Sequence, residues 1–332
     1  MEKLLFVASD GSSGYEYWLT DGTEGGTQRL ANIGSGSSDG APVSVDATTG
    51  RATFEGDIAQ LPGLFFFTAE NGEGLELWVS DGTADGTRAL DVPYPGAGSG
   101  EVTDVQTAAG QVFFYAESPD IGTELWATDG TEEGTRLVVD LWSGSRSAFA
   151  TQQSTLSRLE AFNGGVVFVA NDGTTGPELW FSNGTEAGTR LVADVRPNEF
   201  VLSQQNGSNP QGIDGDGSNI AGDLLFFSAD DGESGRELWV TDGTEGGTRL
   251  VRDIATGSAP SNPRDFTAVG ELMYFTAETG SSGRELWVSD GTAGGTRLAE
   301  DLRPGPQSSD PIDLLAFGGT LVFSAINGNT GR

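Results

Sequence analysis

The sequence predicts an all-β protein, a β-propeller built from four-stranded blades. The first observation is a stretch that recurs six times at intervals of 48 to 60 residues, and a period of this size is typical of propellers and solenoids. The second is a nearly continuous apolar run in each copy, such as residues 64–67, which must be covered on both faces. The third is glycine, 51 of 332 residues, mostly at recurring turn positions. The copies are centred on Trp18, Trp78, Trp126, Trp180, Trp239 and Trp287.

Each copy is expected to form four short strands, which we name a, b, c and d. In the last copy they are residues 265–269, 271–277, 284–289 and 296–301. A tight glycine turn joins a to b, a longer acidic loop joins b to c, and the turn Asp-Gly-Thr-x-x-Gly-Thr joins c to d. The d–a connection is rich in proline and varies most in length. We therefore predict that this link crosses to the next blade, as neighbouring blades cover each other's faces.

The two ends of the chain bear on the number of blades. The chain begins in a b strand, residues 3–8, and finishes with an a strand, 312–317, and a b strand, 321–325. If 312–317 completes the first blade, no edge is left exposed and residues 1–332 form a single domain of six blades. Seven blades in a longer parent is the alternative. Residues 320–332 read as a partial repeat, which predicts that the chain is a fragment of a longer protein.

Composition excludes several function classes. Asp and Glu number 49 against 17 Lys and Arg, a net charge of −32, which repels nucleic acid and anionic lipid. This acidity suits either high salt or the binding of divalent cations, and both alternatives stay open. No His or Cys is present, which removes disulfides, thiolate nucleophiles and imidazole bases. No apolar run is long enough to insert into a membrane.

The c–d turn is predicted to be structural. An Asp or Asn at the start of a turn accepts backbone N–H groups two residues on. Asn keeps the acceptor oxygen but loses the charge that a strong cation ligand needs, so its presence in the fourth copy favours a turn over a cation loop. The six residues are Asp21, Asp81, Asp129, Asn183, Asp242 and Asp290.

Three further side chains recur, a Trp and a Glu in strand c and an Arg in strand d. The Trp and the Glu two residues before it share a face of strand c, and we expect the Trp to pack between blades, with a platform for sugars as the alternative. The Glu is expected to form a cross-strand ion pair with an Arg of strand d. The expected pairs join Glu16, Glu76, Glu124, Glu178, Glu237 and Glu285 to Arg29, Arg88, Arg136, Arg190, Arg249 and Arg297.

Calcium is the one cofactor that the sequence suggests. Hard oxygen ligands spaced by glycine suit Ca²⁺, and the stretch from Asp214 through Asp216 to Ser218, followed by Asp223, has alternate-residue spacing in the longest insertion. The distal Glu of an EF-hand is missing. The acidic b–c loops are a second candidate, although solvated turns explain them equally well. These loops carry Asp10, Glu70, Glu117, Asp120, Asp172, Asp230, Asp231 and Glu278.

The string Glu-Leu-Trp-x-x-Asp-Gly-Thr at 76–83, 124–131, 237–244 and 285–292 resembles the bacterial ELWxxDGT-repeat family. Copy one departs from it at Tyr17 and copy four at Asn183. The resemblance covers nearly the whole chain. It implies a propeller-like module of a large, exported bacterial protein, extracellular or at the cell surface, and brings no catalytic residues. The c–d turn is also similar to the Asp-box hairpins of sialidase-type propellers, where the motif supports the fold.

These observations predict a non-catalytic scaffold or binding module, an adhesion or structural protein that binds protein or glycan through its d–a links. Trp142 and Phe200 are the predicted ligand contacts. One alternative is a polysaccharide lyase or glycosidase that works from the central channel, for which Asp104 and Asp265 are the candidate acids. The other is a subunit of a surface layer or filament that self-assembles through the C-terminal partial repeat by strand exchange.

Overall fold

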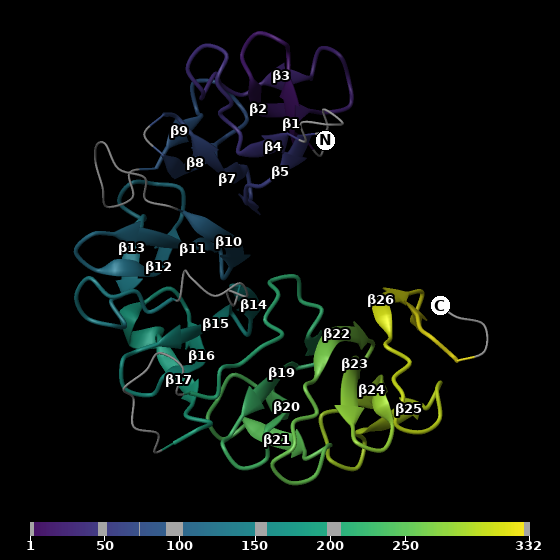
Figure 1. Ribbon diagram of the computed structural model, residues 1–332. Coiled ribbons are helices and arrows are strands. Elements are labelled where there is room, and N and C mark those ends of the chain that lie inside the picture. Colours follow the sequence, from purple (N-terminus) through teal and green to yellow (C-terminus); the bar gives the residue numbers. More distant parts are fainter. Residues whose placement is uncertain are drawn as a thin grey trace. The chain divides into compact units, whose positions relative to one another are not determined.

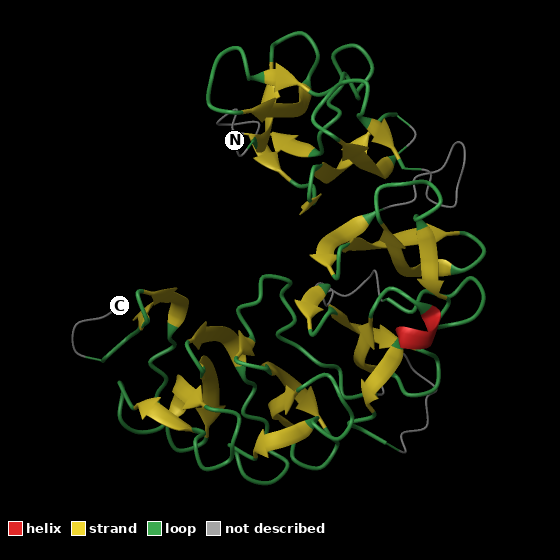
Figure 2. Ribbon diagram, turned by 180° about the vertical axis from the view of Figure 1, so that it is seen from behind, coloured by secondary structure: helices red, strands yellow, loops and turns green. Residues whose placement is uncertain are grey.

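A computed structural model describes residues 3–45, 52–72, 74–90, 102–149, 158–197 and 207–328 (Figure 1). Apart from one 3₁₀ turn, η1 (Glu186–Gly188), the regular elements of these residues are β-strands (Figure 2). Among the same residues, no helix has the length and apolar character needed to cross a membrane.

Each of the six repeats forms one antiparallel sheet, and the strands of a sheet follow one another in sequence order. These sheets are the blades of a β-propeller, as predicted. Five of them contain four strands each, and the first contains three. The first blade is β1 (Leu4–Ser9), β2 (Tyr15–Thr20) and β3 (Gln28–Arg29), and the second is β6 (Ile58–Leu61), β7 (Leu64–Glu70), β8 (Leu75–Ser80) and β9 (Arg88–Ala89). The third is β10 (Thr103–Ala108), β11 (Gln111–Ser118), β12 (Gly122–Thr128) and β13 (Arg136–Val139).

The later blades repeat this order. The fourth is β14 (Glu160–Phe162), β15 (Gly165–Asn171), β16 (Pro177–Ser182) and β17 (Arg190–Ala193), and the fifth is β18 (Ile220–Ala221), β19 (Leu224–Asp230), β20 (Arg236–Thr241) and β21 (Arg249–Arg252). The sixth is β22 (Arg264–Val269), β23 (Leu272–Thr279), β24 (Gly283–Ser289) and β25 (Arg297–Glu300), and a hairpin of β26 (Ile312–Phe317) and β27 (Thr320–Ser324) follows it. The chain divides into two compact units, Met1–Ala148 with Gly184–Glu186, and Phe149–Asn183 with Ala187–Arg332.

The core lies between neighbouring blades. Strand b is apolar on both sides because each of its faces packs against a different layer of side chains. In the second unit, Trp287 of the sixth blade belongs to the same buried cluster as Phe226 and Leu238 of the fifth. In the first unit, Trp126 of the third blade packs with Phe66 of the second. Packing between blades, the role predicted for the repeated Trp, is confirmed at these positions.

Two parts of the fold differ from the prediction. A short hairpin, β4 (Val43–Val45) with β5 (Ala52–Phe54), lies in the link after the first blade and adds two strands to the four that the repeat pattern predicts for each copy. In the fifth blade, strand a is interrupted: Gln211 bridges to Ser228 and Ile220 pairs with Leu225. Residues 212–219 therefore form a loop within the first strand of the blade, and not a part of the link that precedes it.

Candidate functional site

The Asp-Gly-Thr turn is closed by its own side chains. In the last repeat, Asp290 Oδ1 accepts the backbone N–H of Thr292 at 2.9 Å and its hydroxyl at 2.7 Å. The Thr292 hydroxyl oxygen accepts the N–H of Gly295, and Ser289 and Thr296 share a 2.7 Å hydrogen bond. A Cβ at Gly295 would collide with the Asp290 carboxylate. The same network closes the turns at Asp21, Asp81, Asp129 and Asp242, and at Asn183 the flanking hydroxyls of Ser182 and Thr189 pair as well.

In five of the six repeats the Glu of strand c binds backbone N–H groups of the following link and not the Arg of strand d, so the ion pairs predicted for these five are wrong. In five repeats its side chain is fully buried, and it accepts the backbone N–H of the residue 17 positions later, in the d–a link. The register explains the error. Glu124 lies opposite Ala116 of strand b, whereas Arg136 pairs with Ala127, three residues along and on the other face of strand c. The contacts join Glu16 to Ile33, Glu124 to Leu141, Glu178 to Val195, Glu237 to Ile254 and Glu285 to Leu302.

Serine residues at the end of three links complete this contact. Glu237 accepts both the N–H and the hydroxyl of Ser261, at 3.0 and 2.6 Å. Ser208 and Ser309 do the same for Glu178 and Glu285. Each serine precedes an Asn or Asp in the left-handed region and then a proline. Sequence reasoning missed these residues, although the recurring Ser-(Asn/Asp)-Pro before strand a is a visible signal.

The environment of these carboxylates shifts their titration. Burial raises the pKa of Glu124 to about 8 and that of Glu178 to about 7, and the backbone donors only partly oppose it. The pKa values of Glu16 and Glu237 are raised for the same reason. In these four repeats the link is therefore held by a buried acid that is more easily neutralised than an exposed one.

The repeated Arg of strand d reaches the next blade. Arg249 Nη2 donates to the carbonyl of Gly291 at 2.9 Å, in the c–d turn of the following repeat. Arg88, Arg136 and Arg190 make the equivalent contacts to Gly130, Gly184 and Gly243. In the first repeat this position is held by Gln28, whose amide donates to Gly82 at 3.0 Å. Arg29, the predicted partner of Glu16, instead pairs with Asp10 at 3.3 Å.

The predicted calcium loop is organised around a carboxylate of another blade. Glu160 of β14, 2% exposed, accepts the N–H of Gly217 at 3.2 Å. Burial raises the pKa of Glu160, and the negative charges of Asp216 and Asp214 add to the shift. Asp216 also accepts the N–H of Ser218, and Asp223 lies exposed in the next turn. Among the described residues, no group of three acidic side chains is arranged to hold a metal ion, so calcium binding stays a prediction.

The acidic b–c loops use their carboxylates locally. Asp10 accepts the N–H groups and hydroxyls of Ser12 and Ser13, which holds the pKa of Asp10 well below its usual range. Asp172 and Asp231 accept from the corresponding residues of their own loops. These three acids close turns in the way that the c–d aspartates do.

Of the two predicted ligand contacts, Trp142 lies in the link after the third blade and is half-buried, with the Arg146 guanidinium 5.4 Å from its ring centroid. Phe200 lies outside the described residues. The candidate acids of the enzyme alternative share one backbone position. Asp104 and Asp265 both have positive φ, 59° and 58°, at a β-bulge of strand a. The same conformation recurs at Asp313 of β26, with a φ of 55°, so among the described residues these acids hold a recurring backbone position of strand a.

No protein-family model matches the chain, and no curated protein matches it. Solved structures do. A puromycin hydrolase is 18% identical at a TM-score of 0.44, with 97% of this chain and 47% of that one covered. A prolyl endopeptidase is 13% identical at a TM-score of 0.48, with 97% and 44% covered. TolB from Acinetobacter baumannii is 10% identical at a TM-score of 0.35, with 89% and 62% covered.

This chain spans less than half the length of the two hydrolytic proteins that it matches. The shared part is similar in its tandem four-stranded blades. At these identities the likeness concerns the β-propeller fold alone, and it carries no argument about activity.

Proposed function

We propose that this propeller is a non-catalytic binding module, extracellular or at the cell surface, that presents its d–a links to a protein or glycan partner. On the repeated Glu-Leu-Trp-x-x-Asp-Gly-Thr string, we group it with the bacterial ELWxxDGT-repeat proteins. The observation that supports the proposal is the use of the repeated polar residues. The buried Glu holds the link, the Arg joins neighbouring blades and the Asp closes its own turn, so the frame is uniform while the links differ.

A binding surface on such a frame belongs to the segments that vary, because a rigid scaffold with variable loops is the usual arrangement for recognition. Trp142 and Arg146 form the best described example of an aromatic residue and a cation displayed together on a link. Arg146 is exposed, and a stacked aromatic and guanidinium pair is a frequent contact in interfaces.

The test is binding of the labelled protein to intact cells, to immobilised surface glycans and to surface proteins. We expect saturable binding that Trp142→Ala weakens. The control is Ser145→Ala, a change at an exposed position three residues after Trp142 in the same link, and it should leave the binding unchanged. If the protein binds none of these surfaces, the proposal is wrong.

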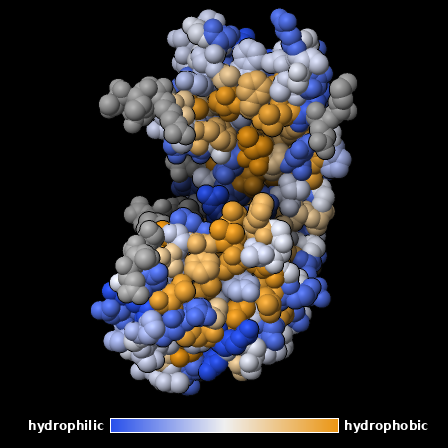
Figure 3. Space-filling model, turned by 90° about the vertical axis from the view of Figure 1, so that its right-hand side faces the viewer, coloured by the Kyte–Doolittle hydropathy of each residue, from blue (hydrophilic) through white to orange (hydrophobic). Residues whose placement is uncertain are grey.

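A second candidate, a subunit that self-assembles by strand exchange, is favoured by the last hairpin. Phe317 is 73% exposed, Leu315 59% and Val322 52%, and apolar side chains gather on the side of the molecule that carries β26 and β27 (Figure 3). Exposed apolar patches of this kind mark interaction sites. Sedimentation over a range of concentrations tests it: self-association that Phe317→Ser abolishes would support it, and a constant monomer mass would exclude it.

A further inference from the structure

A pocket of about 450 Å³ lies where the fifth and sixth blades meet. Gln211 and Arg236 line it from the fifth blade, and Arg264, Glu278 and Arg284 line it from the sixth. Three of the 17 basic residues of the chain thus line one pocket, in a protein whose net charge is −32. The volume is within the range of small-molecule sites.

The three arginines do not belong to the repeat. Arg264 opens strand a of the sixth blade, at the position that Gln211 holds in the fifth. Arg236 and Arg284 directly precede the Glu of strand c. At that position the first four repeats have Tyr15, Leu75, Thr123 and Pro177. The frame of a blade therefore forms without these arginines, and the cluster is specific to this place in the chain.

Arg236 is held at one nitrogen and open at the other two. Its Nη1 donates to the carbonyls of Asn209 and Ser228 at 2.9 and 3.1 Å. Its Nε and Nη2 make no hydrogen bond or ion pair with the described residues, and neither nitrogen is sealed from solvent. A guanidinium fixed in this way still presents two parallel N–H groups, the arrangement that binds both oxygens of a carboxylate.

The other two arginines differ in exposure. Arg284 is 6% exposed, and its Nη1 donates to the carbonyl of Asn262 at 3.0 Å. The side chain of Arg264 is 63% exposed, and its one ion pair with the described residues is to the neighbouring Asp265 at 3.5 Å. Burial lowers the pKa of Arg284, and the positive charge of Arg264 lowers it further. A bound anion would relieve the repulsion between these two charges.

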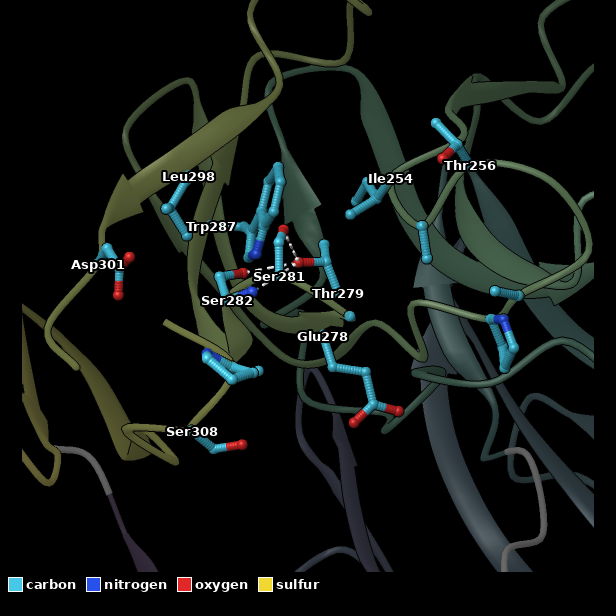
Figure 4. A pocket seen from close by; sticks show the side chains of 16 residues that line it. Ile254, Thr256, Glu278, Thr279, Ser281, Ser282, Trp287, Leu298, Asp301 and Ser308 are labelled. Atoms are coloured by element: carbon cyan, nitrogen blue, oxygen red, sulfur yellow. Dashed lines mark hydrogen bonds between the residues drawn. The ribbon is translucent and has the colours of Figure 1, made fainter. Parts of the chain in front are cut away.

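Glu278 is the acid that lines the pocket. Its carboxylate accepts the side-chain amide of Asn262 at 2.7 Å and lies 3.4 Å from Nη2 of Arg284. Glu278 also lines a larger pocket, of about 1040 Å³, but Figure 4 shows its carboxylate pointing away from Trp287 in that pocket. Its negative charge therefore acts on the arginines. Glu278→Gln would increase the positive charge of the arginine pocket and keep an acceptor oxygen.

The surrounding acids limit the charge of the ligand. Glu278 and Asp265 each pair with one arginine of the pocket. Asp230 acts on the third, although its own ion pair is with Arg196 at 3.5 Å, and Asp310 adds a smaller effect on the arginine that Glu278 binds. The excess of positive charge is therefore small, which suits a single carboxylate. A polyanion would in addition be repelled by the net charge of −32.

We propose that this pocket binds the C-terminal carboxylate of a peptide or protein, with Nε and Nη2 of Arg236 donating to its oxygens and Arg264 adding a second guanidinium at the rim. The inference rests on the proposed binding function and names the group of the partner that is recognised. Gln211 is exposed, and its side-chain amide has no hydrogen-bond partner among the described residues. This amide can donate to or accept from the peptide group behind the carboxylate.

The experiment is equilibrium dialysis of the whole chain against a pool of acetylated tripeptides with uncharged side chains, with the retained peptides quantified by mass spectrometry. One half of the pool has free carboxylates and the other half is amidated. We expect the protein to retain peptides with a free carboxylate and not their amides. Acetate and inorganic phosphate should compete only weakly, because acetate lacks the peptide group and phosphate carries more charge than the pocket neutralises.

The variants separate the pocket from the general charge of the protein. Arg236→Gln and Arg264→Gln should each weaken retention about tenfold, and Glu278→Gln should strengthen it. The matched control is Arg297→Gln, the same change at an exposed position of the sixth blade outside the pocket, and it should bind as the wild type does. Equal thermal midpoints of Arg264→Gln and Arg297→Gln exclude loss of fold as the cause.

Four results would overturn the inference: no peptide is retained, the amides are retained as well as the free acids, acetate or phosphate binds as tightly as the peptides, or Arg264→Gln binds like Arg297→Gln. The cell-surface assay separates these failures from failure of the proposed function. A protein that binds cells equally well after Arg264→Gln still has a partner, which another part of its surface recognises.

Discussion

The contact between Glu237 and the link after the fifth blade gives the sharpest test of how this propeller is held together. The carboxylate accepts the N–H groups of Ile254, Ala255 and Ser261 at 3.0 to 3.3 Å, and the Ser261 hydroxyl at 2.6 Å. Glu237→Ala removes the acceptor for all four donors. At about 1 kcal/mol for each, the lower end of the range because water can enter the space, the cost is about 4 kcal/mol.

Ser261→Ala removes a single hydrogen bond to a charged group and should cost about 2 kcal/mol. In the Glu237→Ala background that bond no longer exists, so Ser261→Ala should cost less there. The interaction energy of the double-mutant cycle should be about 1.5 kcal/mol. Glu245→Ala, at an exposed position of the neighbouring turn, is the control and should change stability by no more than about 0.5 kcal/mol.

The assay is urea unfolding followed by tryptophan fluorescence, together with hydrogen exchange of the amides of residues 254–261. We expect these amides to lose protection in Glu237→Ala and to keep it in the control. If Glu237→Ala lies within about 1 kcal/mol of the wild type, or if the serine change costs the same in both backgrounds, the carboxylate does not hold the link.

Three further predictions concern titration, the bridge between blades and calcium. The folded-state pKa of Glu124, about 8, lies above its ordinary value of 4.5. Its contribution to stability is therefore present below pH 4.5 and is lost as the pH rises through 8. The thermal midpoint should decrease as the pH is raised from 4.5 to 8, and Glu124→Gln should make this decrease smaller. Arg249→Ala should cost about 1 kcal/mol by freeing the Gly291 carbonyl, whereas Arg249→Gln should cost less in urea unfolding, because Gln28 makes the same contact in the first repeat. If the loop of Asp214 binds calcium, Ca²⁺ should raise the thermal midpoint more than NaCl of equal ionic strength, and Asp214→Asn should cancel the difference; equal effects of the two salts would exclude the site.

The blades were predictable because their information is local and repeated. The apolar runs of strand b and the glycine turns specify each hairpin within about thirty residues, and the observed strands β26 and β27 lie where the pattern places them. The contacts between strands and links were harder to predict from the sequence. We predicted that Glu124 and Arg136 form an ion pair because opposite charges on adjacent strands attract each other. The strand register places the two side chains on different faces of the sheet. This register could not be determined from the sequence alone.

In the candidate site too, contacts within one turn could be predicted from the sequence, and contacts between distant segments could not. Asp290 and its equivalents serve their own turns, which the spacing of Asp, Gly and Thr already indicates. The loop of Asp214 has the spacing of a cation loop, yet its amide at Gly217 faces Glu160, a residue more than fifty positions away in sequence.

We propose that this propeller binds its ligand without changing it. The most direct measurement is prolonged incubation of the protein with a saccharide or surface protein that it binds, followed by mass spectrometry of the recovered ligand. We predict saturable binding and a ligand of unchanged mass. A shortened saccharide, an unsaturated sugar end or a cleaved peptide that depends on the protein would contradict the claim and would favour the enzyme alternative.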